Sequence, residues 1–278
     1  MNDRLGKLKK RRMIKLKSVI YLISMMTLAG CSGQKQASVA VEEQSGQWIL
    51  GPFVRPEGVN PVISPQPTTF QCPMRKQPVR WEESDTFNPA ATVKDGKIVV
   101  LYRAEDNSAQ GIGKRTSRIG YAESTDGVTM SQADAPVLFP SEDDFKEIEW
   151  EGGCEDPRVA MTEDGLYVML YTAWNRNLPR LAVATSRDLK NWTKHGLAFA
   201  KAYNGRFANI ASKSASIVTG VKDGRLVIEK VAGKYFMYWG ENAVCAATSD
   251  NLTDWAPVLN ERSEERRVGK ECRSRWSP

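Results

Sequence analysis

The chain has 278 residues, enough for one large domain or two small ones. Its formal net charge of +6 is uneven, because residues 1–30 contribute +7, residues 262–278 contribute +3, and the body between them is mildly acidic at −4. An acidic body argues against nucleic acid as a partner. The one histidine is His195, and the five cysteines form no Cys-x-x-Cys pair, so we expect no metal and no cofactor.

The N-terminus has the pattern of an export signal. A basic run over residues 4–17 precedes an apolar stretch, residues 19–28, that is too short to span a bilayer. The stretch ends in Leu28-Ala29-Gly30-Cys31, which resembles the bacterial lipobox, whose cysteine is acylated. We expect residues 1–30 to be a lipoprotein signal peptide and Cys31 to be the lipidation site. A lipid anchor on Cys31 would hold the protein in the bacterial cell envelope, on the periplasmic or the surface face of the outer membrane.

After a linker, residues 31–46, the chain repeats itself. Three segments align with their starts 62 and 63 residues apart: Ile119–Asp126, Leu181–Asp188 and Val244–Asn251. A run rich in β-branched and aromatic residues precedes each of them, over residues 96–102, 165–171 and 233–238, and predicts a strand. A repeat of this length that holds several short strands is typical of a β-propeller.

The amount of chain sets the expected size of this propeller. Residues 47–261 supply about three and a half units at the observed period, so we expect an all-β fold, an incomplete propeller of about three and a half blades. Residues 262–278 continue no strand pattern and resemble the translation of a sequencing-adapter oligonucleotide. We therefore expect them to be an artefact outside the partial propeller domain.

Polar residues gather where the innermost strand of each repeat is expected, over residues 87–93, 155–160 and 213–218. Because inner strands line the central channel, these residues and the ends of the following strands are predicted to surround one cavity mouth. Carboxylates beside arginine, lysine, asparagine and aromatic side chains suit a sugar. The residues concerned are Asn88, Arg103, Asp106, Glu155, Asp156, Arg158, Lys213 and Glu241. A glycan-binding module fits this pattern as well as an enzyme does.

Five segments resemble glycoside hydrolase family 130 in order and context: Asn60–Ile63, Trp81-Glu82, Phe87–Ala90, Leu101–Ala104 and Gly152–Arg158. The resemblance implies a five-bladed propeller that acts on a mannose-containing oligosaccharide. Family members cleave β-mannosides with inversion of configuration, some by hydrolysis and others by phosphorolysis. It also implies roles: Asp156 is similar to the proton donor, and Asn88, Arg103, Asp106, Glu155, Arg158 and Lys213 are similar to sugar-subsite residues.

Hydrolysis and phosphorolysis need different groups. Inverting hydrolysis needs a second carboxylate that activates water, for which Glu241 is the candidate, and a loop glutamate without a role is the alternative. Phosphorolysis instead needs Arg, Lys or His donors for phosphate. Export favours the hydrolase, because a sugar phosphate is useful only where metabolism takes it up. We expect a β-1,2-mannosidase-like enzyme, with a β-mannoside phosphorylase and a non-catalytic glycan-binding propeller as alternatives, and we expect the incomplete chain to be inactive.

Overall fold

The computed structural model describes residues 54–259 of the chain. The predictions for the signal peptide, Cys31, the linker and residues 262–278 lie outside the described residues. Residues 55–259 belong to one compact unit. No helix in that part is long and apolar enough to cross a membrane.

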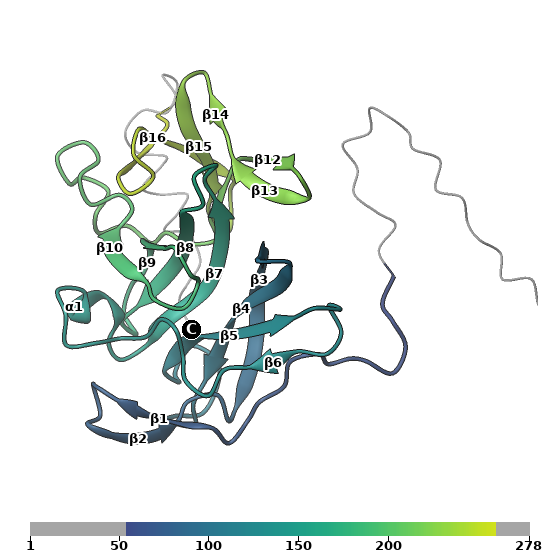
Figure 1. Cartoon of the computed structure of the whole chain (residues 1–278). Helices are drawn as coiled ribbons and strands as arrows, with labels where there is room; N and C mark the ends of the chain where they lie inside the picture. Colours follow the sequence, from purple (N-terminus) through teal and green to yellow (C-terminus); the bar gives the residue numbers. More distant parts are fainter. Residues whose placement is uncertain (1–53, 260–278) are drawn as a thin grey trace, which may run out of the picture. The chain divides into compact units, whose positions relative to one another are not determined.

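Three groups of four antiparallel strands follow one another along the chain (Figure 1). Blade 1 consists of β3 (Asp85–Lys94), β4 (Lys97–Glu105), β5 (Ser117–Ser124) and β6 (Ser131–Gln132). Blade 2 consists of β7 (Gly153–Met161), β8 (Tyr167–Trp174), β9 (Pro179–Ser186) and β10 (Thr193–Leu197). Blade 3 consists of β11 (Ser216–Ile217), β15 (Lys234–Trp239), β16 (Cys245–Ser249) and β17 (Trp255–Pro257). The strands predicted from the repeats are confirmed.

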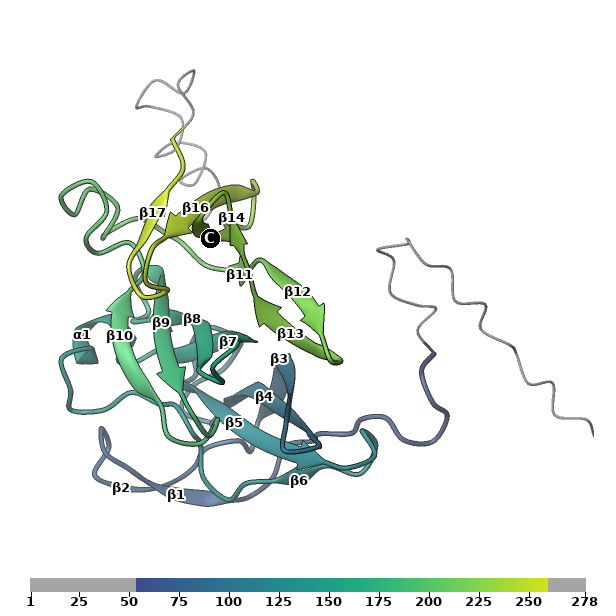
Figure 2. The same cartoon turned by 45° about the horizontal axis from the view of Figure 1, so that its top comes forward.

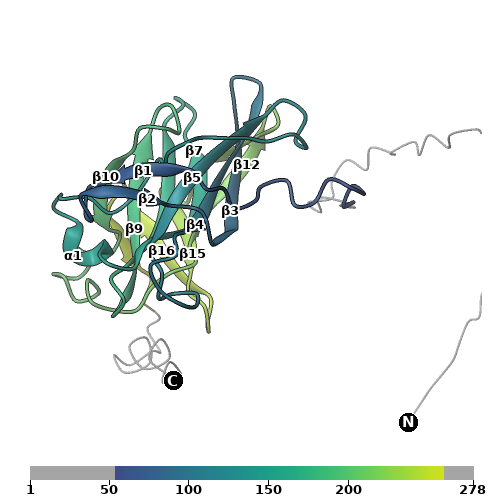
Figure 3. The same ribbon diagram turned by 90° about the horizontal axis from the view of Figure 1, so that it is seen from below.

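Short elements join or flank the blades. A hairpin is formed by β1 (Thr69–Cys72) and β2 (Gln77–Arg80), both labelled in Figure 3. Its side chains Phe70 and Val79 pack against buried residues of blade 1. The helix α1 (Lys146–Glu149) precedes blade 2. A second hairpin, β12 (Thr219–Lys222) with β13 (Arg225–Ile228), and the short β14 (Lys230–Val231) lie within the sequence of blade 3.

The blades stack because their strands are apolar on both faces. In β8, Met169 and Tyr171 pack with residues of blade 1, whereas the alternate residues Val168 and Leu170 pack with Met237 and other residues of blade 3. Blade 2 therefore lies between the other two, as Figure 2 shows. Within the described residues no ladder joins blade 3 to blade 1 or to the β1–β2 hairpin. The fold is the predicted incomplete propeller.

The repeated Ser-x-Asp segment, which is Ser-x-Asn in blade 3, forms the turn before the outer strand of each blade. In blade 2 the Ser186 Oγ accepts hydrogen bonds from the backbone N–H groups of Asp188 and Leu189, at 3.1 and 2.8 Å. Leu189 and its counterpart Leu252 in blade 3 adopt positive φ values of 64° and 70°. These side-chain-to-backbone bonds hold a conformation that leucine rarely adopts, which explains why the serine recurs with the blade period.

Candidate active site

The inner strands of blades 1 and 2 share a backbone bulge. The β3–β4 ladder skips Asn88-Pro89, and the β7–β8 ladder skips Asp156-Pro157. Asn88 has a φ of 46° and Asp156 a φ of 50°, values that residues other than glycine seldom adopt. A bulge points a side chain in a direction that the regular alternation of a strand does not allow. Strained backbone of this kind is common at functional sites. The repeat thus presents Asn88 and Asp156 in matching positions on neighbouring blades.

The two bulges meet at the Asp156 carboxylate. Asn88 Nδ2 donates to Asp156 Oδ1 at 2.8 Å, and Arg103 Nη1 lies 3.2 Å from the same oxygen. Neither contact uses Oδ2, and no other residue in the described part of the chain donates to it. Oδ2 is therefore left without a hydrogen-bond donor from the described residues.

Arg103 is a buried cation shared among carboxylates. Its guanidinium, with a side chain 5% exposed, lies 2.6 Å from Glu105 Oε1 and 2.8 Å from Glu155 Oε1 as well as near Asp156. Burial lowers the pKa of Arg103, but the charges of Glu155, Asp156 and Glu105 outweigh burial and raise it. A second guanidinium, that of Arg115, pairs with Asp85 and lies 3.4 Å from Glu105 Oε2. Two guanidinium groups therefore face four carboxylates, which leaves this region with an excess of negative charge.

Glu155 responds to that excess. Burial raises the pKa of Glu155 to about 7, and the neighbouring charges of Asp156 and Glu105 act in the same direction, while Arg103 and Lys213 oppose them. Near neutral pH the carboxyl group is therefore present in both protonation states. In the acid form it can donate a hydrogen bond to a sugar hydroxyl, and in the ionised form it can accept one.

Two glycines bring blade 2 close enough to blade 1 to build this cluster. Ser117 N donates to Gly152 O at 2.7 Å, and a Cβ atom on Gly153 would lie 2.0 Å from Ser117 O. The Ser117 hydroxyl consequently accepts a hydrogen bond from Arg103 Nε at 3.1 Å and lies 3.4 Å from Glu155 Oε1. Any larger residue at position 153 would force the inner strand away from Ser117.

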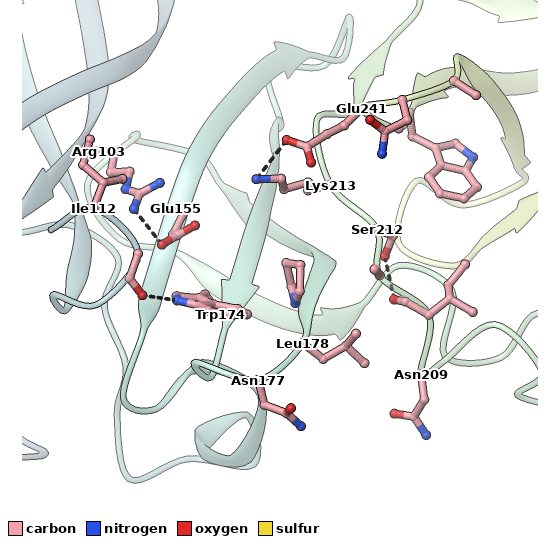
Figure 4. A pocket seen from close by; sticks show the side chains of 18 residues that line it. Arg103, Ile112, Glu155, Trp174, Asn177, Leu178, Asn209, Ser212, Lys213 and Glu241 are labelled. Carbon is pink, nitrogen blue, oxygen red and sulfur yellow. Dashed lines mark hydrogen bonds and ion pairs between the residues drawn. The ribbon is translucent and has the colours of Figure 1, made fainter. Parts of the chain in front are cut away.

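A cavity of about 560 Å³ opens beside the cluster. Figure 4 shows Arg103 and Glu155 on one side of it and the ion pair of Lys213 Nζ with Glu241 Oε1, at 2.9 Å, contributed by the third blade's segments. Trp174 and Trp239 also line it. Four of the predicted site residues therefore line one cavity: Arg103, Glu155, Lys213 and Glu241. Asp156 contacts the cavity residue Arg103, and Asn88 contacts Asp156.

Asp106 does not reach the cavity. It is buried, its Oδ2 accepts from Arg118 Nη1 at 2.9 Å, and its Oδ1 accepts from the backbone N–H groups of Ser108 and Thr116. Although burial raises its pKa, Arg118 and these hydrogen bonds hold the pKa of Asp106 below its usual value. Asp106 anchors both ends of the loop over residues 107–115, so the structure places it in the framework and not among the cavity residues.

Arg158 is also placed elsewhere. Its Nη1 donates to Pro157 O at 2.7 Å, and its side chain borders a separate small pocket together with Ile217 and Leu226. Arg158 pairs with Leu170 of β8, whereas Glu155 pairs with Thr172, so Arg158 lies further along the blade than the cavity that Glu155 lines.

Sequence reasoning missed Ser117 and Trp174. Ser117 begins a strand in an ordinary Thr-Ser-Arg run, and only the approach of Gly152 shows that its hydroxyl matters. Trp174 offered a usable signal, because it ends β8 as Trp239 ends β15 at the corresponding point of the next repeat.

Comparisons with known proteins identify the family of the chain. Residues 58–271 match the sequence profile of glycoside hydrolase family 130, described as β-1,4-mannooligosaccharide phosphorylase. A 1,2-β-oligomannan phosphorylase from Thermoanaerobacter sp. (strain X514) is 32% identical over 194 residues, which are 67% of this chain and 57% of that protein.

Two solved structures are more similar. A candidate glycoside hydrolase from Bacteroides ovatus ATCC 8483 is 76% identical, with a TM-score of 0.74 over 78% of this chain and 62% of that one. Another solved structure is 61% identical, with a TM-score of 0.76 over 77% of this chain and 60% of that one. It is described as coming from the GH130 family of mannoside phosphorylases, which contains glycoside hydrolases that target β-1,2 mannosidic linkages in Candida mannan. The chain spans about three-fifths of these relatives, and the profile match covers most of its length. It belongs to glycoside hydrolase family 130.

Proposed function

We propose that this protein hydrolyses β-mannosides, with a preference for β-1,2 linkages, and that Asp156 is the general acid. The observation that carries the proposal is the Asp156 carboxylate on the bulge of β7, where both neighbouring donors bind Oδ1 and leave Oδ2 for the substrate. A proton on Oδ2 can pass to the departing glycosidic oxygen, directly or through a sugar hydroxyl. Asn88, Arg103 and Glu155 would bind the hydroxyls of the same sugar.

An inverting hydrolase also needs a carboxylate that activates water on the other face of the ring. Glu241 is our candidate, because it lines the same cavity as Glu155 but comes from blade 3, beyond the end of β15. Lys213, at 2.9 Å, holds the Glu241 carboxylate in place. Two carboxylates on different blades can approach one sugar from different sides.

The charge of the cavity supports hydrolysis over phosphorolysis. Both cations that line it, Arg103 and Lys213, are already in ion pairs with carboxylates, and the neighbouring Glu105 and Asp156 add further negative charge. A phosphate dianion would be repelled by this arrangement. The sole histidine of the sequence, His195, lies on the outer strand β10 and bonds Thr185 at 2.8 Å, so it cannot supply a phosphate donor here. The two relatives with solved structures, whose descriptions mention glycoside hydrolases, are 76% and 61% identical to this chain, whereas the 1,2-β-oligomannan phosphorylase is 32% identical.

The test uses the 278-residue chain and a grafted protein, in which residues 58–259 replace the matching part of the 76% identical Bacteroides ovatus relative. Each is incubated with β-1,2-mannobiose in phosphate-free buffer and in buffer with inorganic phosphate. We expect the grafted protein to form mannose at the same rate in both buffers. Product that forms only with phosphate, as mannose 1-phosphate, would replace the hydrolase with a phosphorylase, and binding without any product would indicate a glycan-binding module.

We also propose that the grafted protein is active and the 278-residue chain is not. One face of blade 3 exposes apolar side chains, including Tyr238 at 53% and Val244 at 81% exposure. Each Å² of apolar surface left in water costs about 25 cal/mol, against a stability margin of roughly 5–15 kcal/mol. We therefore expect a lower melting temperature and poorer solubility for the 278-residue chain. Equal melting and activity of the two proteins would contradict this.

For location, we propose a lipid anchor on Cys31 in the bacterial envelope. The basic run, the short apolar stretch and the small residues before Cys31 support it. Expression of the Cys31→Ala variant in a Gram-negative host should move the protein from the membrane fraction to the soluble one. Membrane fractionation that does not change would refute the anchor.

A further inference from the structure

The cavity beside the candidate active site has two chemically different parts. Its polar part carries the two ion pairs, Arg103–Glu155 and Lys213–Glu241. The other part is mainly apolar, and it is lined by Ile112, Trp174, Leu178, Pro179 and Ile210 together with the amides of Asn177 and Asn209. Figure 4 shows Trp174 and Leu178 below the polar pairs in that view. The mannoside chemistry proposed above uses the polar part and gives no role to the apolar one.

The position of Ile112 is fixed by the loop that carries it. Asp106 binds both ends of the loop over residues 107–115, through the N–H groups of Ser108 and Thr116. Near its tip, Gly113 O accepts a hydrogen bond from Trp174 Nε1 at 2.8 Å. The loop therefore joins blade 1 to blade 2 across the edge of the cavity. Ile112 remains 70% exposed at this fixed point and belongs to none of the buried apolar clusters of residues 54–259.

Trp174 presents its ring and not its polar group. Its single donor, the indole N–H, is used by Gly113 O, so the remaining surface that can face the cavity is apolar. Pyranose rings have an apolar face of C–H groups that packs on aromatic and aliphatic side chains. A volume of about 560 Å³ is in the range of cavities that hold ligands larger than one sugar ring.

We propose that Ile112 and Trp174 form the subsite for a second sugar ring, adjacent to the mannose held by the polar part, and that Ile112 is a specificity-determining residue. This inference rests on the proposed function, since it assigns the next residue of the same oligosaccharide. It makes the protein selective for di- and oligosaccharides over single sugars.

The test measures sugar binding by calorimetry. Every protein in it also carries the Asp156→Asn substitution, so that the sugar is not turned over during the measurement. The probes are mannose and β-1,2-mannobiose, and the proteins are the 278-residue chain and the grafted protein. We expect Ile112→Ser to weaken mannobiose binding by roughly tenfold or more and to leave mannose binding unchanged. Val221→Ser is the matched control, because Val221 is 66% exposed on the β12–β13 hairpin and does not line the cavity. Both variants should melt at the temperature of their parent.

The outcomes separate this inference from the proposed function. If both sugars bind and Ile112→Ser changes neither affinity, the inference is wrong and the proposed function stands. An equal loss for mannose and mannobiose would also overturn it, since a second-sugar subsite affects only the larger ligand. If neither sugar binds the parent proteins, the proposed function fails first and the inference falls with it.

Discussion

Blades 1 and 2 carry the same inner-strand bulge with different side chains. In blade 1 the bulge presents the amide of Asn88, and in blade 2 it presents the carboxyl group of Asp156. An amide can position a neighbour by hydrogen bonds but has no proton to give at neutral pH, whereas a carboxylic acid has. The repeat therefore provides two matching geometries, and a difference of one functional group makes one of them a candidate acid and the other its support.

Changing the blade 2 bulge to the blade 1 side chain should have the largest effect. In the grafted protein, Asp156→Asn should lower turnover of β-1,2-mannobiose by about 10²–10⁴-fold, because general acid catalysis is typically worth that much. Binding should change little, since the amide keeps the shape of the carboxylate. Steady-state rates measure the effect on turnover, and calorimetry measures the effect on binding. A rate within about threefold of the parent would show that the two bulges do not differ in the way we propose.

Arg103 connects the two bulges to the buried carboxylates, so its loss should affect stability next. Arg103→Met removes the ion-pair partner of buried Glu155 and the nearer of two partners of buried Glu105, which keeps Arg115 at 3.4 Å. This loss should lower the free energy of unfolding by roughly 3–5 kcal/mol. Arg103→Lys is the control, because it keeps the charge but loses the forked geometry. Urea denaturation of the grafted protein measures both, and an unchanged midpoint for Arg103→Met would contradict the role of this cluster.

Removing the blade 1 side chain should have a smaller effect on rate. Asn88→Ala deletes the donor at 2.8 Å from Asp156 Oδ1 but leaves Arg103 in place. We expect turnover to fall by about tenfold, which is the usual size of one lost hydrogen bond to a charged group at a partly open position. A loss as large as that of Asp156→Asn would mean that the amide, and not the carboxyl group, is the essential one.

The smallest expected change is in the pH dependence of stability. The pKa of Glu155 is about 7 in the folded protein against an ordinary value of 4.5, so the folded state binds more protons between these pH values. The stabilisation that comes from the protonated form is complete below about pH 4.5 and is lost as the pH rises to about 7. Glu155→Gln should remove this decline, which melting temperatures between pH 4 and 8 would detect. A decline of the same size in the variant would assign it to another group.

Much of the fold was predictable from the sequence, because a repeated strand-and-turn pattern is a local property. The Ser186–Leu189 turn and its counterparts recur with the period that predicted the blades, and the run over residues 165–171, rich in β-branched and aromatic side chains, predicted the strand β8. The polar starts of the inner strands likewise predicted that Asn88 and Asp156 lie near each other, and they are hydrogen-bonded.

The sequence could not show which neighbouring polar residues point into the cavity. Asp106 lies one residue after Glu105 and three after Arg103, yet it faces Arg118 and binds the loop over residues 107–115. Arg158 lies directly after the bulge, but the bulge changes the alternation there, so counting residues from Asp156 gives no reliable direction. The role of Ile112 depends on a hydrogen bond between two blades, from Trp174 to Gly113, that leaves no periodic signal.

The most direct test of the account is the dependence of the Asp156→Asn variant on the leaving group. Rates are measured in the grafted protein for β-1,2-mannobiose and for 2,4-dinitrophenyl β-mannoside, whose leaving group departs without a proton. If Asp156 is the proton donor, the variant should lose about 10²–10⁴-fold on mannobiose and no more than a few-fold on the activated substrate. Equal losses on both substrates would contradict the assignment of Asp156 as the acid and, with it, the proposed difference between the two blades.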